Sequence, residues 1–64
     1  MKANRKKLEL AMARKCMSTA DLTVAAGMKR PTLNNVITGR DVRPNTFGRV
    51  AKALGVDVTD IMED

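Results

Sequence analysis

Apolar residues recur along this chain at three- and four-residue intervals, the spacing of amphipathic helices. Leu8, Ala11 and Met12 follow this spacing near the start and predict a first helix over residues 4–15. Neither the alternation typical of strands nor an internal repeat or linker interrupts the pattern. The chain is therefore expected to fold as one all-α domain over residues 1–64.

Local signals for helix ends frame a second helix. Ser18 is a favourable N-cap, Asp21 stands three residues later as its partner in a capping box, and Gly27 is a typical residue at a helix end. They predict a helix over residues 19–26. The turn that follows, residues 27–29, is short, so a third helix is expected to begin almost at once.

The third predicted helix spans residues 30–38. Pro31 fits its first turn, where the missing N–H and the fixed φ do no harm. Leu33, Val36 and Ile37 form the apolar stripe that should face the core. The positions left facing outward are Lys29, Arg30, Thr32, Asn34 and Asn35.

Two further helices are predicted toward the end of the chain. Asn45 is the expected N-cap of a fourth helix over residues 46–54, and Asp57 is the expected N-cap of a short fifth helix. The apolar positions of this fifth helix are Val58, Ile61 and Met62. The sequence therefore predicts a compact five-helix bundle.

Charge is divided unevenly between the body of the chain and its end. Residues 1–52 carry all twelve basic side chains and three acidic ones, a net charge of +9, whereas residues 53–64 carry four acidic side chains and no basic one. This asymmetry favours a body that binds a polyanion and an acidic end that faces away from it. Charge alone is equally compatible with a solvated basic surface.

The composition also argues against several classes of protein. The chain contains no histidine, which removes the commonest general base, and no paired catalytic carboxylates or phosphate-binding glycine loop, so an enzyme is not expected. Cys16 is the one cysteine, so neither an internal disulfide nor a zinc site is expected, and no cofactor is predicted. Without a membrane-spanning run or a secretory signal, the chain is expected to be cytoplasmic.

Two short helices joined through a glycine-containing turn, with basic residues opening the second, are typical of a helix-turn-helix. A helix fits the major groove of duplex DNA, and its first residues reach the base edges. Arg30 can bind O6 and N7 of guanine, and Asn34 or Asn35 can bind N6 and N7 of adenine. Each of these residues alone can equally well solvate a helix, so the prediction of groove reading rests on the whole set.

The order of several short segments resembles the phage-repressor and Cro type of helix-turn-helix domain, including the XRE-like bacterial regulators. The resemblance covers residues 4–62. The matching segments are STADL at 18–22, AAGM at 25–28, TLNNV at 32–36, Gly39, and VAKALGV at 50–56. The resemblance implies a lambda-repressor-like fold with the helix-turn-helix in the second and third helices.

The resemblance also implies roles for individual residues. The expected base contacts come from the third helix, namely from Arg30, Pro31, Thr32, Asn34 and Asn35. Pro31 departs from the family pattern, which often has a polar residue there, and can offer only apolar contact, for example to a thymine methyl. The expected phosphate contacts come from Thr19, Lys29, Arg40 and Arg43.

The function implied is that of a sequence-specific regulator of transcription, expected to be a repressor that occupies operator DNA as a homodimer. One short helix covers only about 4–5 base pairs, too few to specify a site in a genome. The residues expected to form the dimer contact are Val56, Val58, Ile61 and Met62, unless these side chains fold back onto the first and fourth helices. Two other interpretations stay open: an antitoxin or mobile-element accessory factor that binds DNA, and a helical adaptor that binds another protein.

Overall fold

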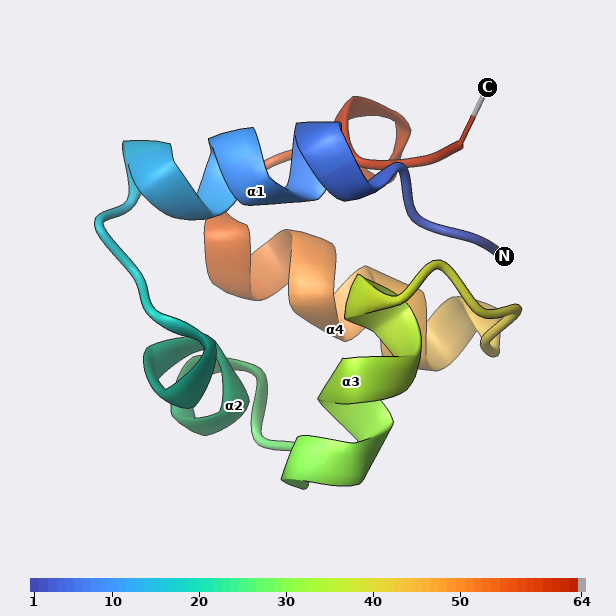
Figure 1. The fold of residues 1–64 in the computed structure, drawn as a ribbon, viewed down its shortest axis with the longest axis horizontal. Coiled ribbons are helices and arrows are strands. Elements are labelled where there is room, and N and C mark those ends of the chain that lie inside the picture. The colour runs from blue at the N-terminus through green and yellow to red at the C-terminus, as the bar shows by residue number, and fades with distance from the viewer. Residues whose placement is uncertain (64) are drawn as a thin grey trace.

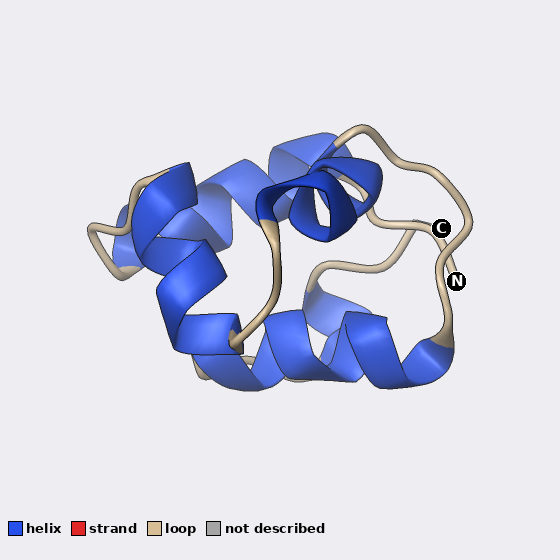
Figure 2. Cartoon of the chain, turned by 90° about the horizontal axis from the view of Figure 1, so that it is seen from below, coloured by secondary structure: helices blue, strands red, loops and turns tan. Residues whose placement is uncertain are grey.

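Residues 1–63 are described by the structure, a computed structural model, and contain four α-helices and one turn of 3-10 helix (Figure 1). These elements are α1 (Arg5–Arg14), α2 (Thr19–Ala26), α3 (Arg30–Ile37), α4 (Pro44–Leu54) and the 3-10 turn η1 (Val58–Asp60). Short loops join the helices (Figure 2). Within this part of the chain no helix combines the length and the apolar character needed to cross a membrane.

The core is built around α4, which lies between α1 on one side and α2 and α3 on the other (Figure 1). Phe47 and Val50 of α4 are completely buried, and α2 packs directly against this helix. Leu22 of α2 and Leu33 of α3 are also fully excluded from solvent. No polar or charged side chain is buried among residues 1–63, so apolar packing holds the helices together.

The helix-turn-helix forms where the sequence predicted it. Ser18 caps α2, its hydroxyl accepting a hydrogen bond from the Asp21 amide at 3.1 Å while the Asp21 carboxylate accepts one from the Ser18 amide at 3.0 Å. Gly27 ends α2 with φ of +64°, a left-handed conformation that glycine adopts at little cost. The capping box and the glycine confirm both predicted ends of this helix, and α3 ends one residue before its predicted end.

Two predictions about the second half of the chain are wrong. The expected fifth helix is only the three-residue turn η1, because Ile61 leaves helical geometry at φ of −122°. The N-cap of α4 is Arg43 rather than Asn45, and Pro44 begins the helix. Proline is well suited to this first helical position, since its fixed φ matches the helix and the amide there needs no helical partner.

An extended N-terminal arm, residues 1–4, pairs with the segment after η1. The Asn4 amide donates to the Ile61 carbonyl at 2.8 Å, and the Glu63 amide donates to the Lys2 carbonyl at 2.9 Å. Between these two hydrogen bonds Ala3 is buried and forms an isolated antiparallel bridge with Met62. The two ends of the described chain therefore lie next to each other, beyond the start of α1 (Figure 1).

Candidate nucleic-acid interface

The exposed face of α3 carries most of the side chains predicted to read bases. Leu33 and Val36 are completely buried, and they fix the rotation of the helix about its axis. Because neighbours along a helix are about 100° apart, the residues between them must face outward. The exposed residues on this face are Arg30, Pro31, Asn34 and Asn35, whereas Thr32 is half-buried.

Four exposed basic residues lie at the start of α3 and in the loop that follows it. They are Lys29, Arg30, Arg40 and Arg43, the residues that begin α3 and flank the loop between α3 and α4. Within residues 1–63, none of these side chains forms an ion pair or a hydrogen bond with another group. Their charges are therefore available to an anion outside the protein.

The first turns of α3 and α4 have an unusual feature in common. The N-cap residues are Lys29 and Arg43, neither helix start receives a side-chain cap, and neither first turn contains an acidic residue. The amides at a helix start lack partners within the helix and carry partial positive charge. Both starts are therefore electrostatically suited to a phosphate group.

The end of α3 directs the chain into a basic loop. Gly39 adopts φ of +81°, and the Arg40 amide donates to the Asn35 carbonyl at 3.0 Å, which closes the last turn of the helix. The loop then passes Arg40 and reaches Arg43 at the start of α4. The backbone thus places Arg40 directly after the last turn of α3 and Arg43 directly before the first turn of α4.

The start of α2, where Thr19 was predicted to contact phosphate, has a different character. Thr19 is half-buried in the first position of the helix, and the capping box already satisfies donors at this end. Hydrogen bonds from the Ser18 amide and hydroxyl lower the pKa of Asp21, so this carboxylate carries negative charge at neutral pH. The charge at this helix start is less favourable to an anion than that at α3 and α4.

The residues predicted to form a dimer contact divide into two groups. Ile61 is completely buried in the core of its own chain, so its side chain is not part of the surface. Val56, Val58 and Met62 are half-buried and pack against the same core. Only the exposed parts of these three side chains are available to a partner.

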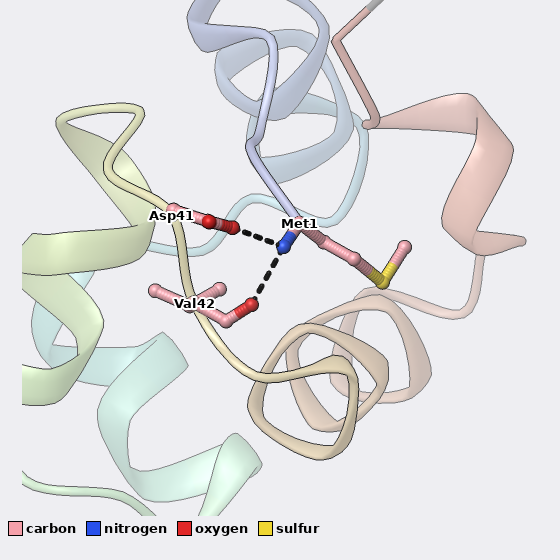
Figure 3. Close-up of polar contacts among 3 residues, drawn as sticks. All are labelled: Met1, Asp41 and Val42. Carbon is pink, nitrogen blue, oxygen red and sulfur yellow. Dashed lines mark hydrogen bonds and ion pairs between the residues drawn. The ribbon is translucent and has the colours of Figure 1, made fainter.

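Sequence reasoning missed one interaction beside the site. The Met1 α-ammonium donates hydrogen bonds to the Asp41 carboxylate and, at 2.7 Å, to the Val42 carbonyl (Figure 3). The Val42 amide in turn donates to the Met1 carbonyl at 2.8 Å. No local pattern could reveal this contact, because forty residues separate Met1 from Asp41.

The comparisons with known proteins agree with this geometry. Searches of curated proteins and of solved structures each found no match. The family model for the Cro/C1-type HTH DNA-binding domain matches residues 7–64, a range that includes α2, α3, α4 and most of α1. The chain belongs to the Cro/C1-type helix-turn-helix DNA-binding family.

Proposed function

We propose that this domain is a sequence-specific regulator of transcription that reads the major groove of duplex DNA with α3. One observation carries the proposal: the start of α3 and the loop that follows α3 carry four exposed basic side chains that have no partner in residues 1–63. A helix start without an acidic cap adds to the positive potential at the same place. The basic side chains, the positive end of the helix dipole and the base-reading side chains are all suited to the same ligand. This ligand is a polyanion with a groove, such as duplex DNA.

The two kinds of contact divide between different residues. Arg30, Asn34 and Asn35 extend from the exposed side of α3 and supply the bidentate groups that distinguish guanine and adenine. Pro31 and Thr32 offer the apolar and hydroxyl contacts of the same helix. Phosphate contacts come from the groups at helix starts and in the loop, namely Thr19, Lys29, Arg40 and Arg43.

We further propose that the domain acts as a repressor by occupying its operator, without a catalytic step, in the cytoplasm. One helix covers about 4–5 base pairs, which is too few to specify an operator. Two copies of the domain therefore bind together. The dimer contact uses the exposed parts of Val56, Val58 and Met62, while Ile61 supports them from the core. Sedimentation with and without operator tests this, and a one-to-one complex on a non-symmetric half-site would exclude it.

Selection of bound sequences from a random duplex pool tests the proposed function directly. The expected result is a two-fold symmetric site whose affinity falls steeply with salt, by about 0.9 in log–log slope for each phosphate neutralised. A helical adaptor that binds another protein through apolar contacts would give no enriched sequence. Duplex affinity that does not change between low and physiological salt would exclude the proposal.

Single substitutions test the division between reading and binding. Arg30→Ala or Asn35→Ala should cost about 1–3 kcal/mol and relax the preference at particular base pairs. Arg43→Ala should weaken all duplexes to a similar extent. Lys6→Ala removes an exposed charge from α1, which Figure 1 shows on the far side of α4 from the start of α3, and serves as the matched control. If Arg30→Ala leaves the base preferences unchanged, α3 does not read the operator.

A further inference from the structure

Two large apolar side chains within residues 1–63 are exposed, one on α1 and one on α2. Leu10 is 53% exposed and Val24 is 83% exposed. Neither belongs to the apolar cluster that holds the helices together. Because exposed apolar surface is unfavourable in water, each side chain is suited to a contact outside its own chain.

The face of α1 around Leu10 is basic. Residues four positions apart share one side of a helix, so Lys6 and Arg14 lie before and after Leu10 on the same side. Both are exposed, and neither forms an ion pair within residues 1–63. Glu9, the one acidic residue of α1, is instead paired with Arg5, whose Nε lies 3.7 Å from Oε1 of the carboxylate. The Leu10 face, made up of Lys6, Leu10 and Arg14, is therefore apolar at its centre and positive at both ends.

The face of α2 around Val24 has the opposite charge. The same helical spacing places Ala20, Asp21 and Gly27 beside Val24, and all three are exposed. Asp21 is the one charged residue of α2, and it forms no ion pair within residues 1–63. Hydrogen bonds from the Ser18 amide and hydroxyl lower its pKa, so the carboxylate is ionised at neutral pH. The Val24 face, made up of Ala20, Asp21, Val24 and Gly27, is therefore apolar, low in relief and negative.

These charges determine which faces of two copies can meet. Two Leu10 faces would bring Lys6 and Arg14 of one copy against the same residues of the other. Two Val24 faces would bring their Asp21 carboxylates together, and like charges at a contact repel each other. A Leu10 face against a Val24 face pairs opposite charges around an apolar centre. Such a contact uses two different surfaces, so it joins copies head to tail rather than about a two-fold axis.

The fold leaves both faces free at the same time. α1 and α2 lie on different sides of α4 (Figure 1), so one copy can offer its Leu10 face to one neighbour and its Val24 face to another. A head-to-tail contact that does not close on itself repeats along a line. Duplex DNA is a linear ligand along which such a row of copies can form.

The small size of the contact makes it dependent on DNA. A stable interface buries about 800 Å² of each partner, roughly one fifth of the 4198 Å² surface of this chain. The few residues of either face supply much less, so the contact is weak between copies free in solution. Copies held side by side on one duplex meet at a high effective concentration, at which a weak contact is occupied.

We propose that the Leu10 face of one copy docks on the Val24 face of a second copy of this chain, and that this contact makes binding to neighbouring stretches of duplex DNA cooperative. The inference rests on the proposed binding of duplex DNA. It is separate from the two-fold contact proposed for Val56, Val58 and Met62, and it leaves that contact free.

Two duplexes of mixed sequence separate this contact from DNA binding itself: a short one that holds a single copy and a long one that holds several. On the long duplex, the original chain should bind about tenfold more tightly beside a bound copy than alone. Val24→Lys should abolish this gain, because its positive charge would face Lys6 and Arg14 of the neighbour. Leu10→Glu should abolish it as well, because its negative charge would face Asp21. If either substitution weakens binding to the short duplex as much as to the long one, the residue acts on DNA and the inference is wrong.

A chain with both substitutions is the matched control for the loss of apolar surface. Opposite charges then meet again across the contact, so a cooperative gain of about two- to fivefold should return. If the double variant is no more cooperative than the two single variants, the two faces do not meet.

Cysteine pairs test the direction of the contact. Cys16 is exposed and has φ of +54°, so Cys16→Gly removes its thiol at a position that suits glycine. In this background one chain carries Leu10→Cys and another carries Val24→Cys. With both chains on the long duplex, oxidised glutathione should join unlike chains in preference to like ones.

The remaining outcomes separate the inference from the proposed function. A predominance of disulfides between like chains would show a two-fold contact and overturn the inference. Binding of the original chain to both duplexes without cooperativity would overturn the inference and leave the proposed function intact. Absence of binding to either duplex would refute both.

Discussion

The starts of the helices in this domain fall into two kinds. At α2, Ser18 and Asp21 form a complete capping box, and at η1 the Asp57 carboxylate accepts from the Thr59 amide at 3.1 Å while Asp60 completes a second box. At α3 and α4 the N-cap residues are Lys29 and Arg43, and no side chain caps either start. The start of α1 is also capped, because the Asn4 side chain accepts from the Lys7 amide at 3.0 Å. Of the five helix starts within residues 1–63, those of α1, α2 and η1 are therefore closed by a side chain, and those of α3 and α4 are open.

The two kinds of helix start have different consequences for stability and for binding. A capping box satisfies the amides of a helix start within the protein and typically contributes about 1 kcal/mol. An open start with a basic N-cap gives up that contribution and adds like charge to the positive end of the helix dipole. Such an arrangement is unfavourable for folding and favourable for an anionic partner. The open starts are those next to the proposed DNA-binding face.

The largest effect on stability is expected beside the closed helix start of η1. Ile61, directly after η1, is completely buried, so Ile61→Ala should cost about 2–5 kcal/mol, comparable to the whole stability of so small a domain. Ile61→Val should cost about 0.5–1.5 kcal/mol and keep the chain folded. On the open side, Asn35→Ala should stay within about 0.5 kcal/mol of the original chain. Chemical denaturation measures the free energy of unfolding of all three variants. An Ile61→Ala chain as stable as its parent would contradict the packing of the η1 segment into the core.

A substitution that closes an open start should change stability and affinity in opposite directions. Lys29→Asp places an N-cap carboxylate near the Thr32 amide of α3, which should raise the free energy of unfolding by about 0.5–1 kcal/mol. The same change removes a cation and adds an anion beside the phosphates, so duplex affinity should fall roughly 10- to 100-fold.

Lys29→Ala separates the two effects. It removes the charge without adding a cap, so it should lower affinity by a smaller factor and give no gain in stability. Thermal unfolding and duplex titration of the same samples provide both numbers. If Lys29→Asp binds DNA as well as the original chain, the open start of α3 does not face phosphate.

The capping boxes of α2 and η1 should make the stability of the domain depend on pH in the acid range. Hydrogen bonds from Ser18 lower the pKa of Asp21, and hydrogen bonds from Thr59 lower the pKa of Asp57. A carboxyl group with a lowered pKa in the folded chain stabilises it above the unfolded pKa of about 4, and this stabilisation is lost as the pH falls through the folded value. Asp21→Ala with Asp57→Ala should lower Tm at pH 7, and the difference from the parent should shrink in strong acid. A difference that grows toward low pH would contradict the caps.

The parts of the fold that depend on neighbours in sequence were predictable. The start and end of α2 follow from Ser18, Asp21 and Gly27, and both agree with the structure. The apolar stripe of α3 likewise predicted that Leu33 and Val36 are buried. These signals act over three or four residues, which is the range within which a sequence pattern and a helix share the same geometry.

The parts that depend on distant contacts were not predictable. η1 ends early because the Ile61 carbonyl accepts from the Asn4 amide, a pairing across most of the chain. The end of α1 lies within one residue of its predicted place, but the conformation that follows it was not predicted: Cys16 adopts φ of +54°, a left-handed conformation that usually signals glycine. A left-handed residue with a Cβ has no clear signature in sequence.

The candidate site shows the same division. The exposed positions of α3 follow from its apolar stripe, so Arg30, Asn34 and Asn35 were identified without a structure. The contact of the N-terminal arm with the loop after α3 was not, because forty residues separate Met1 from Asp41. The sequence also predicted Thr19 as a phosphate ligand by resemblance, while the capping box makes its helix start the less positive one.

The smallest effect concerns Gly48, the one glycine inside a helix. A Cβ built there would meet nothing within 4 Å, so Gly48→Ala should raise the free energy of unfolding by about 0.5–1 kcal/mol through the helix preference of alanine. Gly27→Ala is the matched control, because its Cβ would also meet open space but its φ is +64°. That substitution should cost about 1–2 kcal/mol. Changes of opposite sign in the free energy of unfolding, measured by chemical denaturation, would show that the two glycines differ in backbone geometry rather than in contacts. A loss of stability in Gly48→Ala would instead mean that α4 has a closer neighbour at this position.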